Sequence, residues 1–293
     1  MDLKQIVLLA LQVSILITVF GFGLNATTAD LLYLLRRPGL LARSLLAMFV
    51  IVPILVVAVV PIFNLTRAVE VVIVALSLSP VPPLLPRKED KGSGPSAYGL
   101  GLMVILAVAS IVLIPLELEL LQRYVGRELS MAPSAIAGVV VKAVVLPILA
   151  GMLIRAFAPA VAARIEKPVV LIGNILLPLA VVALLAGTYS AIWALVGDGT
   201  VMALTIFTVA GLAVGHVLGG PDPEHATVLA LSTACRHPAI AFAIATANFP
   251  DRSFGPLILM YVLVNAILGI PYLAWRRRRR AGGTRIEAAN GRR

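Results

Sequence analysis

A charged side chain, a titratable ring and a helix breaker follow one another inside an apolar stretch of membrane length. They are Arg236, His237 and Pro238, in the sequence Ser232-Thr233-Ala234-Cys235-Arg236-His237-Pro238. An arginine at the centre of a membrane helix costs about 2.5–3.5 kcal/mol on insertion scales, so an intramembrane charge normally marks a functional site. The planar guanidinium group suits a carboxylate, and the imidazole can carry a proton near neutral pH. These residues predict a transport site for an organic anion, with the proton as a candidate coupling ion.

The same residue types also allow a structural interpretation, and the sequence leaves both open. Arg236 can cap backbone carbonyls as a fixed cation, and His237 can make a static hydrogen bond. Lys142 lies inside a predicted span, where its stem can snorkel or its ammonium group can meet carbonyls at a helix break. The remaining candidates are small polar residues that can satisfy backbone groups as well as a substrate. The candidate substrate-binding residues are Arg236, His237, Ser79, Ser232, Thr233, Asn265 and Lys142.

A second proline-rich interruption occurs in the first half of the chain. Both interruptions follow an Ala-Leu-Ser sequence, which is a weak internal repeat. Proline has no N–H and clashes with the carbonyl four residues before it, so Pro238 should free the carbonyl of Ala234. The prolines of the first break should free those of Leu78 and Ser79. Paired interruptions of this kind are a strong sequence pointer to a transporter site. The predicted helix-break residues are Pro80, Pro82, Pro83 and Pro238.

The composition excludes a water-soluble globular protein. Of the 293 residues, 60% are hydrophobic and 13% are charged, whereas soluble proteins are about half apolar. The single cysteine, Cys235, excludes an intrachain disulfide and a multi-cysteine metal site, and the sequence suggests no metal and no cofactor. No orienting acid or oxyanion site accompanies Ser79, Ser232 and His237, so we do not expect an enzyme. We expect an all-α polytopic membrane protein.

Nine apolar segments are long enough to cross a bilayer core of about 30 Å, which needs about 20 helical residues. Their short connections predict a single transmembrane transporter domain over residues 1–275, with a first repeat at about 5–120 and a second at about 132–275. Residues 276–293 are predicted to be a basic, disordered cytoplasmic tail. The nine spans are 5–25, 40–62, 68–86, 97–120, 132–156, 168–191, 200–219, 225–248 and 254–275.

Basic residues predict the orientation, because Lys and Arg concentrate in cytoplasmic loops. With nine spans and a cytoplasmic C-terminus, most of the 24 Lys and Arg residues lie on the inside, so the N-terminus is predicted outside and the location is the cell (inner) membrane. The run from Arg276 to Arg280 is interpreted as a topology determinant that also contacts anionic membrane lipid. The basic residues are spread over loops without a soluble module, which argues against nucleic-acid binding. The inside groups are Arg36, Arg37 and Arg43; Arg87, Lys88 and Lys91; Arg155, Arg164 and Lys167; Arg276 to Arg280; and Arg285, Arg292 and Arg293.

The chain resembles the bile acid:sodium symporter family from about Phe20 to Ala274. The resemblance implies a core domain built around two discontinuous helices that cross, a smaller panel domain, and an inverted repeat. It also implies a nine-span member, without the additional N-terminal helix of ten-span members. The similar segments are Gly21-Phe22-Gly23-Leu24, Asp30 to Pro38, Met48-Phe49 with Pro53, the Ser79-Pro80 break, Val141 to Pro147 with Gly151, and Asn265 with Gly269.

The second break departs from the family pattern in the residues that would bind sodium. Family sodium symporters read Glu-x-Gly-x-Gln-Asn there, whereas this chain has Ser232, Ala234, Arg236 and His237 at the four specified positions. Another glutamine of the family pattern, in the third family helix, aligns with Met48. Because sodium needs hard oxygen donors and favours a nearby carboxylate, we do not expect the usual two-sodium coupling.

The sequence offers Arg236 no acidic partner at membrane depth. The glutamates are predicted near span ends and the aspartates in loops, so backbone carbonyls or an anionic substrate are expected to pair with the guanidinium group. The acidic residues considered are Glu70, Glu117, Glu119, Asp30, Asp198 and Asp251.

The leading hypothesis is a secondary transporter for an organic anion, either bile acid-like or a small carboxylate, that works by alternating access at the two broken helices. One alternative is a binding or sensor protein on the same fold that does not transport. Another is a conventional sodium symporter whose ion ligands are displaced.

Overall fold

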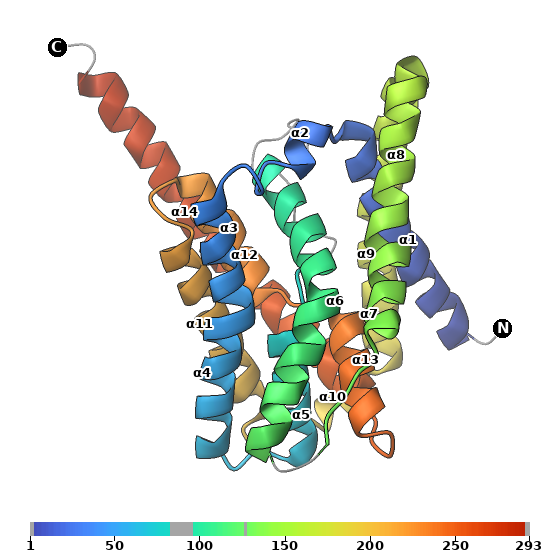
Figure 1. The fold of residues 1–293 in the computed structure, drawn as a ribbon, viewed down its shortest axis with the longest axis vertical. Coiled ribbons are helices and arrows are strands. Elements are labelled where there is room, and N and C mark those ends of the chain that lie inside the picture. The colour runs from blue at the N-terminus through green and yellow to red at the C-terminus, as the bar shows by residue number, and fades with distance from the viewer. Residues whose placement is uncertain (1–2, 83–95, 126–127, 291–293) are drawn as a thin grey trace.

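The computed structural model describes residues 3–82, 96–125 and 128–290, and this part of the chain is helical without strands (Figure 1). The α-helices are α1 (Leu3–Asn25), α2 (Thr28–Leu31), α3 (Pro38–Leu46), α4 (Val52–Val59), α5 (Arg67–Leu78), α6 (Ala97–Val125), α7 (Pro133–Val140), α8 (Leu146–Phe157), α9 (Pro159–Gly187), α10 (Tyr189–Trp193), α11 (Thr200–Leu218), α12 (Pro223–Ala234), α13 (Pro238–Asn248) and α14 (Gly255–Asn290). Two π-helical segments, η1 (Ala47–Ile51) and η3 (Val141–Val145), and one 3-10 segment, η2 (Val60–Ile62), connect some of them.

Eight helical segments in the described residues are long and apolar enough to cross a membrane. Their outward faces carry large apolar side chains, including Val112, Val182 and Ile270, which are 63–70% exposed. Exposed apolar surface on this scale is typical of helices that face lipid. The protein is therefore a multi-pass membrane protein. The eight segments are Gln5–Asn25, Pro38–Ile62, Ala97–Arg123, Pro133–Phe157, Pro159–Gly187, Thr200–Leu218, Pro223–Asn248 and Gly255–Arg279.

The predicted third span, residues 68–86, is not among these eight. Helix α5 has only 12 residues and ends at Leu78, because the chain turns to extended backbone at Ser79, before Pro80. A residue that precedes proline is disfavoured in the helical region, which explains the position of this end. The predicted break residue Pro83 lies outside the described residues.

Prolines also shape two of the long spans. Helix α3 begins at Pro38 and α7 at Pro133, where the missing N–H costs no helical hydrogen bond. The π-helical segments η1 and η3 end two residues before Pro53 and Pro147, which are the second residues of α4 and α8. Since a proline cannot donate to the preceding turn, the helix widens there and continues.

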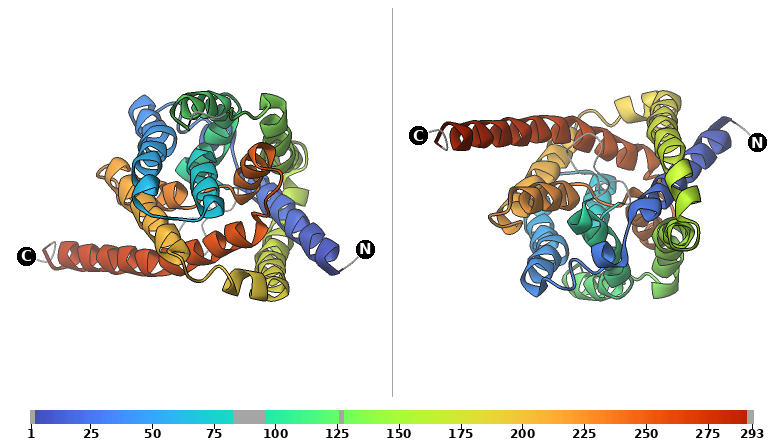
Figure 2. Two further views of the ribbon diagram at one scale, coloured as in Figure 1. Left: turned by 90° about the horizontal axis from the view of Figure 1, so that it is seen from below. Right: turned by 90° about the horizontal axis from the view of Figure 1, so that it is seen from above.

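Helices α1, α8 and α9 pack against one another and lie together in Figure 1, on the side where α1 crosses the long helices. At Gly151, a β-carbon would lie 2.5 Å from the carbonyl oxygen of Phe20, so only glycine allows α8 to approach α1 this closely. Helices α11 and α12 form a second close pair, in which a β-carbon at Gly211 would lie 2.7 Å from the Cα of Ala234. Viewed along the bundle, α5 lies near the centre of the remaining helices (Figure 2).

The C-terminal residues that were expected to be disordered are helical as far as Asn290, because α14 continues through the arginine run. Arginine and alanine are strong helix formers, and no proline follows Pro271 to stop the helix. Arg276 is 9% exposed and donates from Nε to Oγ1 of Thr227 and from Nη2 to the carbonyl of Pro223, at 2.8 and 2.7 Å. Arg276 therefore packs against the start of α12.

Candidate functional site

The first break lies where α5 ends, and it presents backbone carbonyls. Ser79 is extended (ψ 146°), and its hydroxyl donates back to the carbonyl of Leu76 at 2.8 Å. The carbonyls of Ser79 and Pro80 are thereby outside the helix and accept hydrogen bonds from the second break. Ser79, Pro80 and Pro82 are all buried. The first break is thus a neutral, buried group of acceptors.

The second break separates α12 from α13. Cys235 and His237 are extended, with ψ of 108° and 104°, and α13 begins at Pro238. The carbonyl of Ala234 accepts from Oη of Tyr261 at 2.8 Å and from Nδ2 of Asn265 at 2.9 Å. The prediction that Pro238 frees this carbonyl is confirmed, and two side chains of α14 replace the missing helical donor.

Arg236 and His237 connect the two breaks. The backbone N–H of His237 donates to the carbonyl of Pro80 at 2.8 Å. Nη1 of Arg236 donates to the carbonyl of Ser79 at 3.1 Å. Arg236 is 0% exposed, although arginine is among the residues least often buried. The two interruptions, 157 residues apart in sequence, therefore form one site.

Arg236 also binds the π-helical segment of the second predicted span. Nη1 donates to the carbonyl of Met48 at 3.0 Å, and Nε donates to the carbonyl of Thr233 at 2.9 Å. Met48 lies in η1, five residues before Pro53, whose missing N–H leaves carbonyls of this turn without their helical donor. One guanidinium group therefore satisfies carbonyls from three separate elements.

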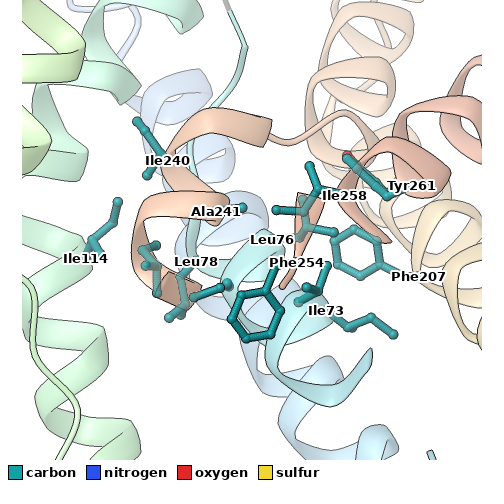
Figure 3. Close-up of a cluster of buried hydrophobic side chains, with 14 of the residues drawn as sticks. Ile73, Leu76, Leu78, Ile114, Phe207, Ile240, Ala241, Phe254, Ile258 and Tyr261 are labelled. Carbon is teal, nitrogen blue, oxygen red and sulfur yellow. The ribbon is translucent and has the colours of Figure 1, made fainter. Parts of the chain in front are cut away.

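Tyr261 was not identified from the sequence, although it completes this arrangement. Its hydroxyl donates to the carbonyl of Ala234 and accepts from the backbone N–H of Arg236. Tyr261 is 1% exposed and lies beside Phe207 of α11 and Ile258 of α14 (Figure 3). A tyrosine four residues before Asn265, which places both on one helical face, is the signal that could have found it.

Of the other predicted substrate-binding residues, Thr233 and Ser232 lie at the second break, whereas Lys142 lies apart from both breaks. Oγ1 of Thr233 donates to the carbonyl of Leu229 at 2.7 Å, so this hydroxyl is used within α12. Ser232 is fully buried. Lys142 is exposed on η3, and none of the hydrogen bonds of the breaks involves it.

Three buried polar atoms at the second break have no hydrogen-bond partner among the described residues. They are Nη2 of Arg236, Nε2 of His237 and Oγ of Ser232. Nδ1 of His237 accepts from the N–H of Ile240 at 3.4 Å, so this nitrogen caps α13 and, in the neutral ring, Nε2 carries the hydrogen. Buried donors without acceptors are costly, so this end of the break is suited to accept a further polar group.

Glu117 was expected near the end of its span, at about residue 120. Helix α6 continues to Val125, so Glu117 lies two turns before the end of the helix. Both carboxylate oxygens are buried without a hydrogen-bond partner among the described residues. The charges of Glu117 and Arg236 interact, although the two side chains form no salt bridge.

A cavity of about 290 Å³ lies between α4, α5, α6 and α13. Leu118 and Leu121 of α6 line it, together with Leu78 next to the first break, and its lining is mainly apolar. Arg67 and Glu70 contribute charge and form a salt bridge of 3.0 Å. The cavity can admit an organic molecule with an apolar body.

A polar network closes the other end of the bundle, where α2, α6 and α12 meet. Nε2 of His225 and Oη of Tyr33 are 2.8 Å apart, and the imidazole packs edge-on against Tyr98. Oγ of Ser96 donates to Oε1 of Glu224 at 2.7 Å. These hydrogen bonds join side chains of different elements, so a movement of one element against another could break them.

Comparisons with known proteins identify the family of the chain. Residues 12–195 match the model of the sodium bile acid symporter family, a match that ends before Arg236. The chain is 26% identical over 277 residues to two proteins named "Probable sodium/metabolite cotransporter BASS5, chloroplastic", from Oryza sativa subsp. indica and subsp. japonica. The aligned region covers 88% of this chain and 67% of each relative. The chain belongs to the sodium bile acid symporter family and is a membrane transporter.

Proposed function

We propose that the protein is a secondary transporter of an organic anion that works by alternating access at its two helix breaks. The observation that carries the proposal is the fully buried guanidinium group of Arg236, which joins both breaks and η1. An intramembrane charge held by backbone carbonyls attracts an anion, and the apolar cavity beside the first break suits the body of an organic molecule.

The proposed architecture is an inverted repeat of nine spans, in which the interrupted segments α5 and α12–α13 belong to a core domain. The close packing of α1, α8 and α9 supports a separate panel domain formed by these helices. Three groups of basic residues that were predicted inside follow α2, end α8 and lie in the last part of α14, and these elements lie at the same end of the bundle (Figure 1). Their common position supports an outside N-terminus and a cytoplasmic C-terminus. In this orientation the cavity between α5 and α13 faces outside and the His225 network closes the cytoplasmic side.

In this proposal Arg236 has two roles that use different atoms. Nε and Nη1 hold the carbonyls of Thr233, Met48 and Ser79. Nη2 remains as the donor for an anion, with Nε2 of His237 and Oγ of Ser232 as further buried polar atoms of the break. The structural and the substrate-binding interpretations of Arg236 are therefore compatible. Lys142, exposed on η3, is not part of this proposed site.

Sodium coupling is the second candidate, favoured by the family and by the names of the rice relatives. At the second break the fixed charge of Arg236 opposes it, because a sodium ion there would be repelled and the carbonyls of Ser79 and Met48 already accept from the guanidinium group. We propose that Arg236 replaces the bound cation of a sodium symporter.

Transport in liposomes tests these alternatives. Purified protein is reconstituted, and uptake of taurocholate, benzenesulfonate and pyruvate is measured under a sodium gradient, a proton gradient or a membrane potential, with empty liposomes as the control. We expect uptake of an organic anion that does not require sodium. Uptake only with sodium would support the second candidate, and thermal stabilisation by an anion that never crosses would support a sensor protein. No binding and no uptake of any of the three would contradict the proposal.

A further inference from the structure

We infer that Glu117 is a proton-binding site whose occupancy controls anion binding at Arg236, so that one proton and one anion move together. This inference rests on the proposed transport function and adds its coupling ion. Glu117 belongs to α6, outside both breaks, and its two carboxylate oxygens are buried without a hydrogen-bond partner among the described residues.

Glu117 lies on α6 among residues that face the cavity and the core. Ile114, Leu118 and Leu121 recur at helical spacing on one face of α6, and Glu117 lies at the edge of this face. Ile114 points towards Ile240 of α13 and Leu78 of α5 (Figure 3). Leu118 and Leu121 line the cavity. Leu118, which follows Glu117 in the sequence, lines the cavity, and Glu117 itself is not part of the lining. In this inference the cavity is the route by which a proton approaches Glu117, and Arg236 acts on it from the break.

Arg67 and Glu70 of the cavity pair with each other at 3.0 Å, and the other charged groups around α6 also leave Arg236 as the main electrostatic partner of Glu117. On α6 itself, Glu119 and Arg123 are exposed and pair with each other at 3.2 Å. Asp30 of α2 and Glu224 and His225 of α12 belong to the opposite end of the bundle, and α7 carries no titratable side chain. Lys142 of η3 is exposed. His237 lies next to Arg236 in the break.

Charge balance explains the coupling. When the carboxyl group of Glu117 is ionised, its negative charge offsets that of Arg236, so an additional anion gains little by entering. When a proton binds Glu117, the charge of Arg236 is no longer offset, and an anion can take its place near Nη2. The net charge is zero in both states: ionised Glu117 with Arg236 in the first, and protonated Glu117 with Arg236 and a bound monovalent anion in the second. A neutral site is cheaper to move between the two faces of a membrane than a charged one.

The same buried carboxylate could serve only as a fixed counter-ion of Arg236, and the two roles have different consequences. A fixed counter-ion would remain ionised throughout the cycle and would form a direct, hydrogen-bonded pair, as buried charges generally require. The structure has no salt bridge between these side chains, and the carbonyls of Thr233, Met48 and Ser79 take three of the guanidinium donors. This arrangement favours a carboxyl group that exchanges its proton.

The test uses Glu117→Gln, which keeps the shape of the side chain and mimics the protonated state. Glu119→Gln, on the same helix but exposed, is the matched control. Taurocholate and benzenesulfonate are the probes, because sulfonates stay ionised across the pH range and any pH dependence then comes from the protein. Both variants are reconstituted, and uptake under a proton gradient and exchange of internal for external probe are measured separately.

We expect wild type and Glu119→Gln to accumulate probe when the outside is acidic, with an apparent affinity that falls about tenfold per pH unit once Glu117 ionises, as linkage to one proton requires. Glu117→Gln should exchange probe at every pH but should lose accumulation driven by the proton gradient. Accumulation by Glu117→Gln equal to that of wild type would overturn the inference while leaving the proposed transport function intact.

Infrared difference spectroscopy of the reconstituted protein provides a second measurement that needs no substrate. A pH jump should produce a carbonyl stretching band of a buried, protonated carboxyl group in wild type and Glu119→Gln, and the band should be absent in Glu117→Gln. If the band does not respond to pH in wild type, Glu117 is not the proton site. If neither sulfonate binds or moves but the band responds, the proposed function fails for these anions and the proton site stands.

Discussion

The two helix breaks play opposite chemical roles. The break after α5 contributes only acceptors, the carbonyls of Ser79 and Pro80. The break between α12 and α13 contributes the donors, the guanidinium group of Arg236 and the N–H of His237. Each break alone would leave polar groups unsatisfied at membrane depth, and together they satisfy most of them. The comparison shows that a side-chain cation of the second break, Arg236, donates to a carbonyl of the first.

Among the substitutions considered, loss of the Arg236 guanidinium group should reduce stability and anion binding the most. Arg236→Met would leave the carbonyls of Met48, Ser79 and Thr233 without donors and Glu117 without its opposite charge. Removing one partner of a buried charge system costs about 3–5 kcal/mol, so we expect a large loss of thermal stability in detergent and of anion binding. Arg123→Met, which removes an exposed salt bridge, should cost about 0–1 kcal/mol.

A double variant tests whether the effect comes from charge or from the carbonyls. If Glu117 is destabilised by the loss of Arg236, then Arg236→Met with Glu117→Gln should be about 1–2 kcal/mol more stable than the two separate effects predict. Additive effects would mean that the carbonyls alone account for the loss. Full stability of Arg236→Met would contradict the complementarity of the two breaks.

Comparison of these residues with the sequence predictions separates local effects from long-range ones. The freed carbonyl of Ala234 was predictable, because proline acts on a residue at a fixed separation. The bond from Arg236 to Met48 joins residues 188 positions apart through a π-helical turn, and no local pattern specifies that pairing. Glu117 was expected near a span end because the predicted span stops at 120, whereas α6 continues to Val125. The depth of Lys142 in a span could not reveal that its side chain is exposed.

Substitution of Tyr261 at the second break should reduce stability less than substitution of Arg236. Tyr261→Phe removes the acceptor of the Arg236 N–H and one of two donors to the carbonyl of Ala234, and Asn265 remains as the other donor. A buried donor left without an acceptor costs about 1–3 kcal/mol, and we expect thermal unfolding to report a loss in this range. Tyr189→Phe is the control, because Tyr189 is 63% exposed and should change stability little. An equal effect of both substitutions would mean that the hydroxyl of Tyr261 does not support the break.

The smallest expected effect is that of the His237 side chain, since its link to the first break uses the backbone N–H, which every substitution except proline retains. His237→Ala removes only the cap that Nδ1 provides to the N–H of Ile240, and loss of an N-cap typically costs about 1 kcal/mol. His237→Asn can keep that cap and should be closer to wild type in thermal unfolding. If His237→Asn instead loses as much stability as His237→Ala, the imidazole contributes through Nε2, whose hydrogen is buried without a partner among the described residues. The donors of the second break would then include a second side chain beside that of Arg236, and its asymmetry with the first break would be larger than the hydrogen bonds indicate.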